Sequence, residues 1–212
     1  MELLTRLRER RLLAIVRADD VRSALACIEV LADEGIDVIE VSLTGRDALA
    51  VLAEVRLSFG DTVELGAGTV MTAEQAQSAV AAGASYLVTP SLSAGADEGV
   101  RLGVPVLMGA LTPTEVTRAV ECGATAVKLF PAEFGGPRYL AALRAPFPDV
   151  PFVPVGGVDA AAAGAFLEAG ALAVGVGSPL LGDAATGGDL SDLRARAREL
   201  RSAVATLSQD RG

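Results

Sequence analysis

One junction recurs along the chain: a helix-like segment ends at a glycine, and a short apolar strand follows directly. It occurs in "DEGIDVIEV", "AAGASYLVT", "RLGVPVLMG", "ECGATAVKLF" and "EAGALAVGVG", with the glycines at Gly35, Gly83, Gly103, Gly123 and Gly170. A glycine at such a position takes the left-handed conformation that closes a helix. Five uses of the same junction predict a chain built from repeated strand–helix units.

Eight apolar strands are expected, at residues 12–17, 37–43, 63–70, 86–90, 105–110, 126–131, 152–158 and 173–178. Near-continuous apolar strands are typical of a parallel sheet covered by helices. The pattern predicts an α/β fold, a compact (β/α)8 TIM barrel, with a doubly wound sheet as the alternative. Residues 1–212 are expected to form a single domain, with a short amphipathic helix in "MELLTRLRERR". Residues 180–192 are expected to be a flexible loop before a final Arg-rich helix.

Charge and composition exclude several classes of function. The net charge of −9 argues against a nucleic-acid partner, since phosphate backbones are held by Lys and Arg. No apolar stretch approaches the roughly 20 residues that span a bilayer, and no signal segment is expected. Cys27 and Cys122 lack CxxC neighbours and are expected to be free thiols in a cytoplasmic protein. The chain has no histidine, which excludes histidine-based triads and histidine-ligated zinc.

Lys128 is the chain's only lysine, and it lies in the apolar run "AVKLFP". Strand alternation puts Ala126, Lys128 and Phe130 on one face, which we expect to be the barrel interior. Burial disfavours the ammonium form, and a neutral amine can attack a carbonyl carbon. An arginine cannot do this because its guanidinium stays protonated. A lysine whose stem packs while its amine reaches water at the barrel rim is the alternative.

Glu40 and Arg17 are two further charged residues with an inward strand phase. Glu40 lies in "DVIEVSL", where it either carries protons beside the amine or forms a structural ion pair. Arg17 ends the first strand and either holds a substrate carboxylate or pairs with Glu40, Asp19 or Asp20.

Glycines follow the last two strands. "VGGV" and "VGVGS" end them with Gly156, Gly157, Gly177 and Ser178, and barrels frequently bind phosphate at these two loops. The glycines let an anion approach backbone N–H groups, so we expect a phosphate cradle here; simple turn glycines are the alternative.

The chain resembles the family of 2-keto-3-deoxy-6-phosphogluconate (KDPG) and 4-hydroxy-2-oxoglutarate (KHG) aldolases. The resemblance runs from "AIVRADD" to "VGVGSPLL" and is carried by "IEVSLT", "GAGTV", "VTPSL", "FVPVGGV" and above all "KLFPAEFGGPRYL". It implies a class I, Schiff-base carbon–carbon lyase, commonly a homotrimer, that acts on a small 2-keto acid phosphate. No metal or organic cofactor is expected, and no nucleic-acid or membrane partner.

The resemblance also implies a role for each matching residue. Lys128 forms the Schiff base, Glu40 carries protons, Thr69 contacts the pyruvyl carboxylate, and Pro90 and Phe130 shape the pyruvyl pocket. Many members place an arginine four residues after the glutamate, where this chain has Thr44. Arg17, or less favourably Arg46, is expected to replace it.

The expected reaction is cleavage of KDPG to pyruvate and glyceraldehyde 3-phosphate. The alternatives are a KHG aldolase or a 2-keto-3-deoxy-6-phosphogalactonate aldolase. More distant ones are a phosphosugar isomerase or synthase without an imine, and a phosphosugar-binding regulatory barrel.

Overall fold

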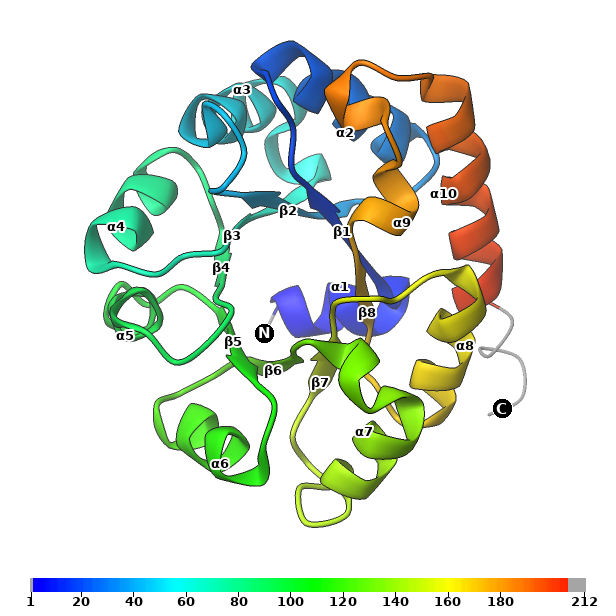
Figure 1. Ribbon diagram of the computed structural model, residues 1–212. Helices are drawn as coiled ribbons and strands as arrows, with labels where there is room; N and C mark the ends of the chain where they lie inside the picture. The colour runs from blue at the N-terminus through cyan, green and yellow to red at the C-terminus, as the bar shows by residue number, and fades with distance from the viewer. Residues whose placement is uncertain (1, 206–212) are drawn as a thin grey trace.

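The eight predicted strands form one parallel sheet that is rolled into a barrel (Figure 1). The computed structural model describes residues 2–205. The strands are β1 (Leu12–Val16), β2 (Val38–Ser42), β3 (Glu64–Gly68), β4 (Tyr86–Val88), β5 (Val106–Ala110), β6 (Ala126–Leu129), β7 (Phe152–Pro154) and β8 (Val174–Val176). They pair in the order β7-β6-β5-β4-β3-β2-β1-β8, and a bridge between Val155 and Gly175 joins the two edges. The barrel prediction is confirmed, and the doubly wound alternative is wrong.

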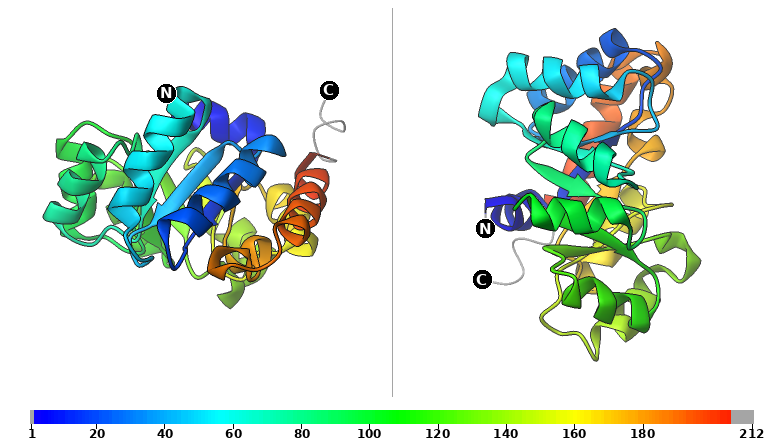
Figure 2. Two further views of the ribbon diagram at one scale, coloured as in Figure 1. Left: turned by 90° about the horizontal axis from the view of Figure 1, so that it is seen from above. Right: turned by 90° about the vertical axis from the view of Figure 1, so that its left-hand side faces the viewer.

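A helix follows each strand and covers the outside of the barrel (Figures 1 and 2). The helices are α1 (Glu2–Arg10), α2 (Val21–Asp33), α3 (Ala48–Phe59), α4 (Ala73–Ala81), α5 (Ala94–Arg101), α6 (Pro113–Glu121), α7 (Gly136–Arg144), α8 (Ala160–Glu168), α9 (Ser178–Leu181) and α10 (Leu190–Ala205), with single 3-10 turns at η1 (Gly60–Thr62), η2 (Ala132–Phe134) and η3 (Ala184–Thr186). Among residues 2–205, no helix combines the length and apolar character needed to cross a membrane.

Strand alternation divides the buried side chains into two cores. Val127 and Leu129 of β6 point outward into the larger core beneath the helices, whereas Ala126 belongs to the smaller core inside the barrel. β1 behaves likewise, with Leu13 inside and its neighbours outside. The period-2 pattern therefore decides which side chains can reach the barrel axis.

Helix α1 closes one end of the barrel. Its Leu3 and Leu7 are almost fully buried and pack into the barrel-interior core against residues such as Leu13 and Val153. The side view shows α1 at the end opposite to the loops that follow the strands (Figure 2). The predicted amphipathic helix is thus confirmed, and it leaves the barrel open only at the carboxyl ends of its strands.

Helix starts and stops follow the predicted signals. All five junction glycines have positive φ, from +74° at Gly103 to +105° at Gly83. At the start of α4, Thr72 and Gln75 form a capping box, in which the Thr72 hydroxyl accepts from the Gln75 amide and the Gln75 side chain accepts from the Thr72 amide. A capping box satisfies two backbone donors that the helix leaves free.

Thr72→Ala is expected to lower the free energy of unfolding by about 1 kcal/mol, because the first turn of α4 loses its side-chain acceptor. Urea unfolding followed by circular dichroism measures this change. Ser78→Ala is the matched control, since Ser78 is exposed in the same helix and its hydroxyl caps nothing. Equal urea midpoints for the two variants would contradict the assignment of the cap.

The prediction for residues 180–192 is wrong. This segment holds the end of α9, the turn η3 and the start of α10, and it buries Leu180, Leu181, Ala184 and Ala185 against the outer core. Its Gly, Asp and Thr residues have a low helix propensity and are typical of loops. Burial of the apolar residues between them outweighs this preference, so short helical turns form instead.

The final helix is tied to α2 by ion pairs. Arg194 and Arg198 of α10 both bind the Glu34 carboxylate, at 2.7 and 2.9 Å. These two guanidinium groups lower the pKa of Glu34. The first and last helical units of the barrel are therefore held together side by side.

Candidate active site

The inward side chains of neighbouring strands meet at the open end of the barrel. The register aligns Ile15, Glu40, Gly66 and Tyr86 across β1 to β4, and it aligns Gly109 with Lys128 across β5 and β6. Two of these inward positions, Gly66 and Gly109, have no side chain. The larger side chains on the neighbouring strands therefore have room to lean toward the barrel axis. In most barrels of this fold, bulky branched residues fill that space.

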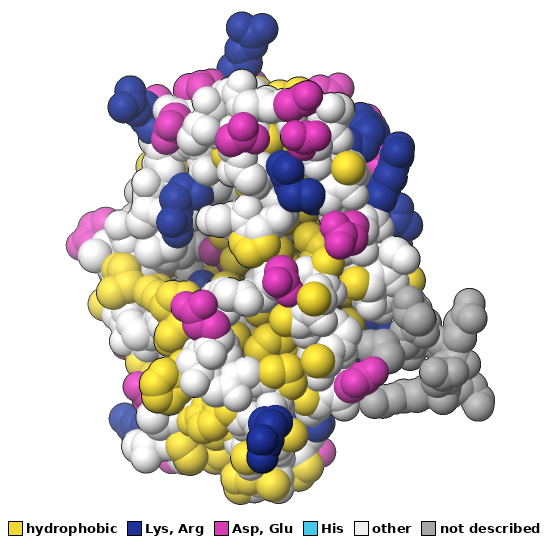
Figure 3. Space-filling view, turned by 45° about the vertical axis from the view of Figure 1, so that its right-hand side comes forward, with side chains coloured by type: hydrophobic (Ala, Val, Ile, Leu, Met, Phe, Trp, Pro, Cys, Tyr) yellow, Lys and Arg dark blue, Asp and Glu magenta, His cyan; other side chains and the backbone are white. Residues whose placement is uncertain are grey.

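Lys128 lies inside the barrel, as its strand phase predicts. It is only 5% exposed, and its ammonium nitrogen lies 5.1 Å from the centre of the Phe130 ring. No carboxylate among the described residues forms an ion pair with it within the 4.0 Å limit. In the space-filling view the opening is a hollow at the left, with dark-blue basic atoms between apolar side chains (Figure 3).

Glu40 is a buried acid close enough to Lys128 to feel its charge, and the residue is only 1% exposed. Burial raises the pKa of Glu40, and the nearby charges of Lys128 and Arg17 oppose that rise without cancelling it. Its Oε2 atom is buried and has no hydrogen-bond partner among the described residues. The predicted alternative, a structural ion pair with an arginine, is not formed in the described chain. A carboxyl group that is buried beside cationic groups can gain and lose a proton during a reaction.

Gly68 makes the position of Glu40 possible. A Cβ atom at residue 68 would lie 1.6 Å from the Glu40 Oε1 atom, so no side chain fits there while the carboxylate stays. The second glycine of "GAGTV" is therefore required because Glu40 of the neighbouring strand occupies the space beside it. The sequence of one strand alone does not reveal this contact.

Thr69 follows this glycine and lies in the left-handed region, with φ of +60°. Its hydroxyl is 3.1 Å from the Ser42 hydroxyl, which in turn lies 2.9 Å from that of Thr44. Ser42 is 1% exposed and joins the two threonines into one chain of hydroxyl groups. The sequence interpretation missed this function of Ser42, although its phase matches that of Glu40. Non-glycine residues with positive φ are uncommon, and they cluster at functional sites.

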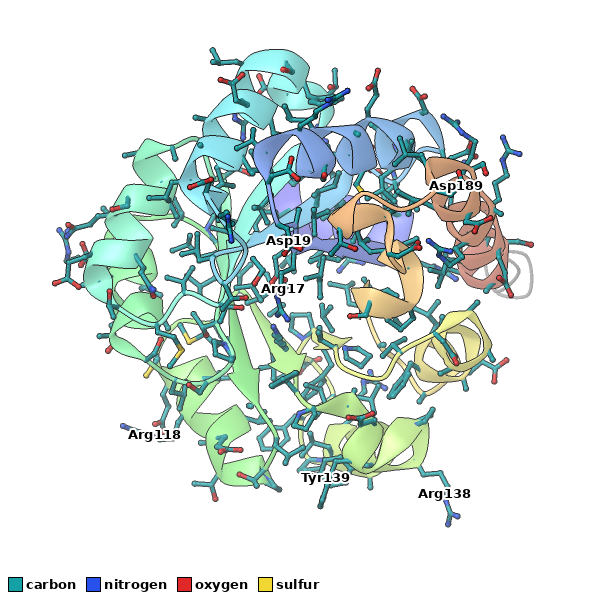
Figure 4. The ribbon with its side chains drawn as sticks, turned by 45° about the horizontal axis from the view of Figure 1, so that its top comes forward. Arg17, Asp19, Arg118, Arg138, Tyr139 and Asp189 are labelled. Atoms are coloured by element: carbon teal, nitrogen blue, oxygen red, sulfur yellow. The ribbon has the colours of Figure 1, made fainter. Side chains whose placement is uncertain are left out.

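Arg17 is exposed and follows β1 directly, at the barrel opening (Figure 4). It forms no ion pair with Glu40, Asp19 or Asp20 in the described chain, so the alternative of a structural salt bridge is not seen. Its charge nevertheless acts on Glu40. Arg46 is also exposed, in the turn after β2, and only its backbone amide is engaged, by the carbonyl of Ala18.

Pro90 and Phe130 border a pocket of about 200 Å³ that is also lined by Gly109. Gly109, the strand neighbour of Lys128, provides the space, because a Cβ atom there would lie 2.1 Å from the Pro90 carbonyl. Thr89, which is fully buried, fixes this turn by donating a hydrogen bond to the Ser91 carbonyl at 2.7 Å. Sequence reasoning missed Thr89. Its only signal is its place in the "VTPSL" motif.

Gly156 and Gly157 follow β7 with φ of +97° and +71°, and Gly177 and Ser178 follow the adjacent β8. The two loops therefore lie next to each other at the open end. The Glu133 side chain fills the space beside Gly157, where a Cβ atom would meet its Oε2 at 2.6 Å. Within residues 2–205, no group of three or more His, Cys, Asp or Glu is placed to hold a metal ion.

The site thus combines a buried primary amine, an acid of raised pKa and hydroxyl groups at the carboxyl ends of the barrel strands. An amine can condense with a ketone, and an adjacent acid can supply and remove the protons that condensation requires.

Comparison with known proteins agrees with this chemistry. The sequence profile of the family described as KDPG and KHG aldolase matches residues 3–194. The chain is 39% identical over 150 residues to a 2-dehydro-3-deoxy-phosphogluconate aldolase of Treponema pallidum, covering 70% of this chain and 71% of that one. It is 34% identical over 171 residues to the 2-dehydro-3-deoxy-6-phosphogalactonate aldolase of Escherichia coli, covering 80% and 83%.

A solved structure matches as well. The KDPG aldolase of Legionella pneumophila, with pyruvate captured as a covalent carbinolamine intermediate, superposes with a TM-score of 0.84 at 28% identity, covering 90% of this chain and 94% of that one. With its barrel, its buried amine and a family match over nearly its whole length, the chain belongs to the KDPG and KHG aldolase family.

Proposed function

We propose that the enzyme cleaves KDPG to pyruvate and glyceraldehyde 3-phosphate through an imine on Lys128. Family membership makes the chain a carbon–carbon lyase. The observation that carries the assignment of the nucleophile is the burial of the chain's only lysine beside an acid of raised pKa.

In this mechanism the Lys128 amine condenses with the C2 ketone, and the protonated imine accepts the electron pair of the breaking C3–C4 bond. Glu40 moves protons during imine formation, takes the proton of the C4 hydroxyl and returns one to the enamine. Thr69 and Arg17 orient the substrate carboxylate, and Pro90 and Phe130 enclose the pyruvyl group. Water then releases pyruvate from Lys128.

Borohydride reduction in the presence of pyruvate tests the nucleophile. We expect a stable pyruvyl adduct, which peptide mass mapping assigns to Lys128. Omitting pyruvate is the control. An adduct at another residue, or none at all, would refute the imine mechanism.

We propose that the loops after β7 and β8 hold the distal phosphate, with Gly156, Gly157 and Gly177 giving access to backbone N–H groups and Ser178 donating its hydroxyl. Support comes from their adjacent positions and from the frequent use of this pair of loops for phosphate in barrels.

Ser178→Ala is therefore expected to raise KM for KDPG about 10-fold, the value of one hydrogen bond to a charged group. The value of kcat/KM for unphosphorylated KHG is expected to stay unchanged, and this substrate is the internal control. An equal loss for both substrates would contradict a phosphate-specific role.

The 2-keto-3-deoxy-6-phosphogalactonate reaction is the second candidate, because the Escherichia coli relative carries that activity in its name. The two substrates differ only in configuration at C4. Initial rates of pyruvate release from each epimer decide between them.

We further propose that the enzyme is a homotrimer, as the family resemblance implies, and that it works in the cytoplasm, which suits its two free cysteines. A cyclic trimer pairs two different surfaces of each copy. Large apolar side chains are exposed on separate elements, with Leu57 of α3 at 80% and Phe134 of η2 at 74%. Light scattering that gave the mass of one chain would contradict the trimer.

A further inference from the structure

Two side-chain polar atoms inside the barrel are buried without a hydrogen-bond partner among the described residues. They are the Tyr86 hydroxyl and the Glu40 Oε2 atom. Leaving a buried polar atom unpaired costs stability, so such atoms call for an explanation. Tyr86 is fully buried and has no place in the mechanism above.

The register brings these two residues to the same part of the barrel. Glu40 pairs with Gly66, and Gly66 pairs with Tyr86, so the three residues form one row across β2, β3 and β4. The middle residue has no side chain, and the Tyr86 ring lies over it. A Cβ atom at Gly66 would be 2.3 Å from the ring carbon that carries the hydroxyl.

Glu40 approaches the same strand from the other side, where its carboxylate lies over Gly68. Two glycines on the inner face of β3 therefore make room for the acid and for the phenol. Tyr86 belongs to the barrel-interior core, so its hydroxyl points within the cavity and not into the helix layer.

The chemistry of the two groups is complementary. Burial, with the charges of Glu40 and Glu64, raises the pKa of Tyr86, so its hydroxyl remains protonated. A hydroxyl both donates and accepts. It can donate to an ionised carboxylate and accept from a protonated one, which suits an acid that gains and loses a proton in each turnover.

We propose that Tyr86 is a positioning residue for Glu40, and that its hydroxyl hydrogen-bonds the Oε2 side of the carboxyl group, directly or through one water. This inference rests on the proposed function of Glu40 as proton carrier. The structure shows no hydrogen bond between the two groups, and catalytic hydrogen bonds commonly tighten when substrate binds.

Tyr86→Phe tests the proposal, because it removes the hydroxyl and keeps the ring that fills the barrel. The charged or titratable groups facing Glu40 are Lys128 from β6, Arg17 from β1 and Tyr86 from β4, and Glu64 of β3 faces the phenol. Only the phenol changes. Without its donor the ionised carboxylate is less stable, so the pKa of Glu40 rises further.

We expect the acidic limb of the kcat profile, which reports the substrate-bound enzyme, to move upward by about one pH unit and kcat to fall about 3- to 10-fold. KM should stay within about twofold, since the phenol does not touch substrate. A profile that superposes on that of the wild type overturns the proposal, and so does a fall in kcat without movement of the acidic limb.

Tyr139→Phe is the matched control. Tyr139 is the only other tyrosine, and its hydroxyl donates to the Leu111 carbonyl at 2.6 Å, outside the barrel interior (Figure 4). The same atom is lost, and the pH profile is expected to stay in place. Borohydride trapping tests the imine on Lys128 separately from the role of Tyr86. If both the wild type and Tyr86→Phe form the adduct on Lys128, the proposed imine mechanism stands whatever the pH profile shows.

Discussion

Lys128→Arg is expected to fold as the wild type does and to lose at least about 10⁴-fold in kcat, with no pyruvyl adduct after borohydride reduction. The substitution keeps a positive charge at the same place in β6. It removes the amine that is proposed to form the imine, and a guanidinium cannot replace that amine because it does not lose its proton. A coupled assay for pyruvate, with circular dichroism to verify folding, measures both parts of the result.

Chemical rescue makes this prediction stricter. Lys128→Cys, treated with 2-bromoethylamine, regains an amine of nearly the same length and is expected to recover a measurable part of the activity. The wild type treated in the same way is the control for modification elsewhere. Cys27 is protected from this reagent because burial raises its pKa to about 11. Activity in untreated Lys128→Arg would support an isomerase or synthase that forms no imine.

Glu40→Gln is expected to lower kcat by roughly 10²- to 10⁴-fold, the usual contribution of a positioned acid–base group. The amide fills the same space over Gly68 but carries no transferable proton. Pyruvate should still bind, and the adduct on Lys128 should form more slowly. Measuring the exchange of pyruvate methyl protons with deuterium isolates the step assigned to Glu40. Exchange at the wild-type rate would exclude Glu40 as the proton carrier.

The same variant is expected to be more stable than the wild type at high pH. The folded state raises the pKa of Glu40, so the folded protein holds this proton more tightly than the unfolded chain does. Stability from this group is complete below the unfolded value of about 4.3 and is lost as pH rises through the folded value. Glutamine mimics the protonated form, so Tm should exceed that of the wild type at pH 8 and match it near pH 4. A lower Tm at pH 8 would mean that the ionised acid stabilises the fold.

Much of this site could be predicted from the sequence because strand phase is a local property. A period of two puts Lys128 and Glu40 on inward faces without knowledge of the other strands. The junction glycines are equally local, since each closes its own helix. The inward positions of Lys128 and Glu40 and the barrel itself therefore follow from patterns within single segments.

The features that could not be predicted depend on contacts between strands. The Tyr86 ring fits inside the barrel only because its neighbour on β3 is Gly66. The register that pairs these two residues cannot be inferred from the sequence of either strand alone. Ser42 became part of the site through a hydroxyl contact with Thr69, 27 residues later. The sequence of residues 180–192 predicts a loop, whereas the structure buries its apolar residues in the core beneath the helices, a contact that the segment's own sequence does not reveal.

The leucines that α1 inserts into the barrel have a consequence for the order of events in turnover. Because α1 seals the other end, substrate and products can enter and leave the barrel only at the carboxyl ends of the strands. In the proposed mechanism pyruvate stays bound to Lys128 after the C3–C4 bond breaks, so the fragment bearing the phosphate is expected to leave first. Pyruvate should therefore behave as the last product off, inhibiting competitively against the intact substrate.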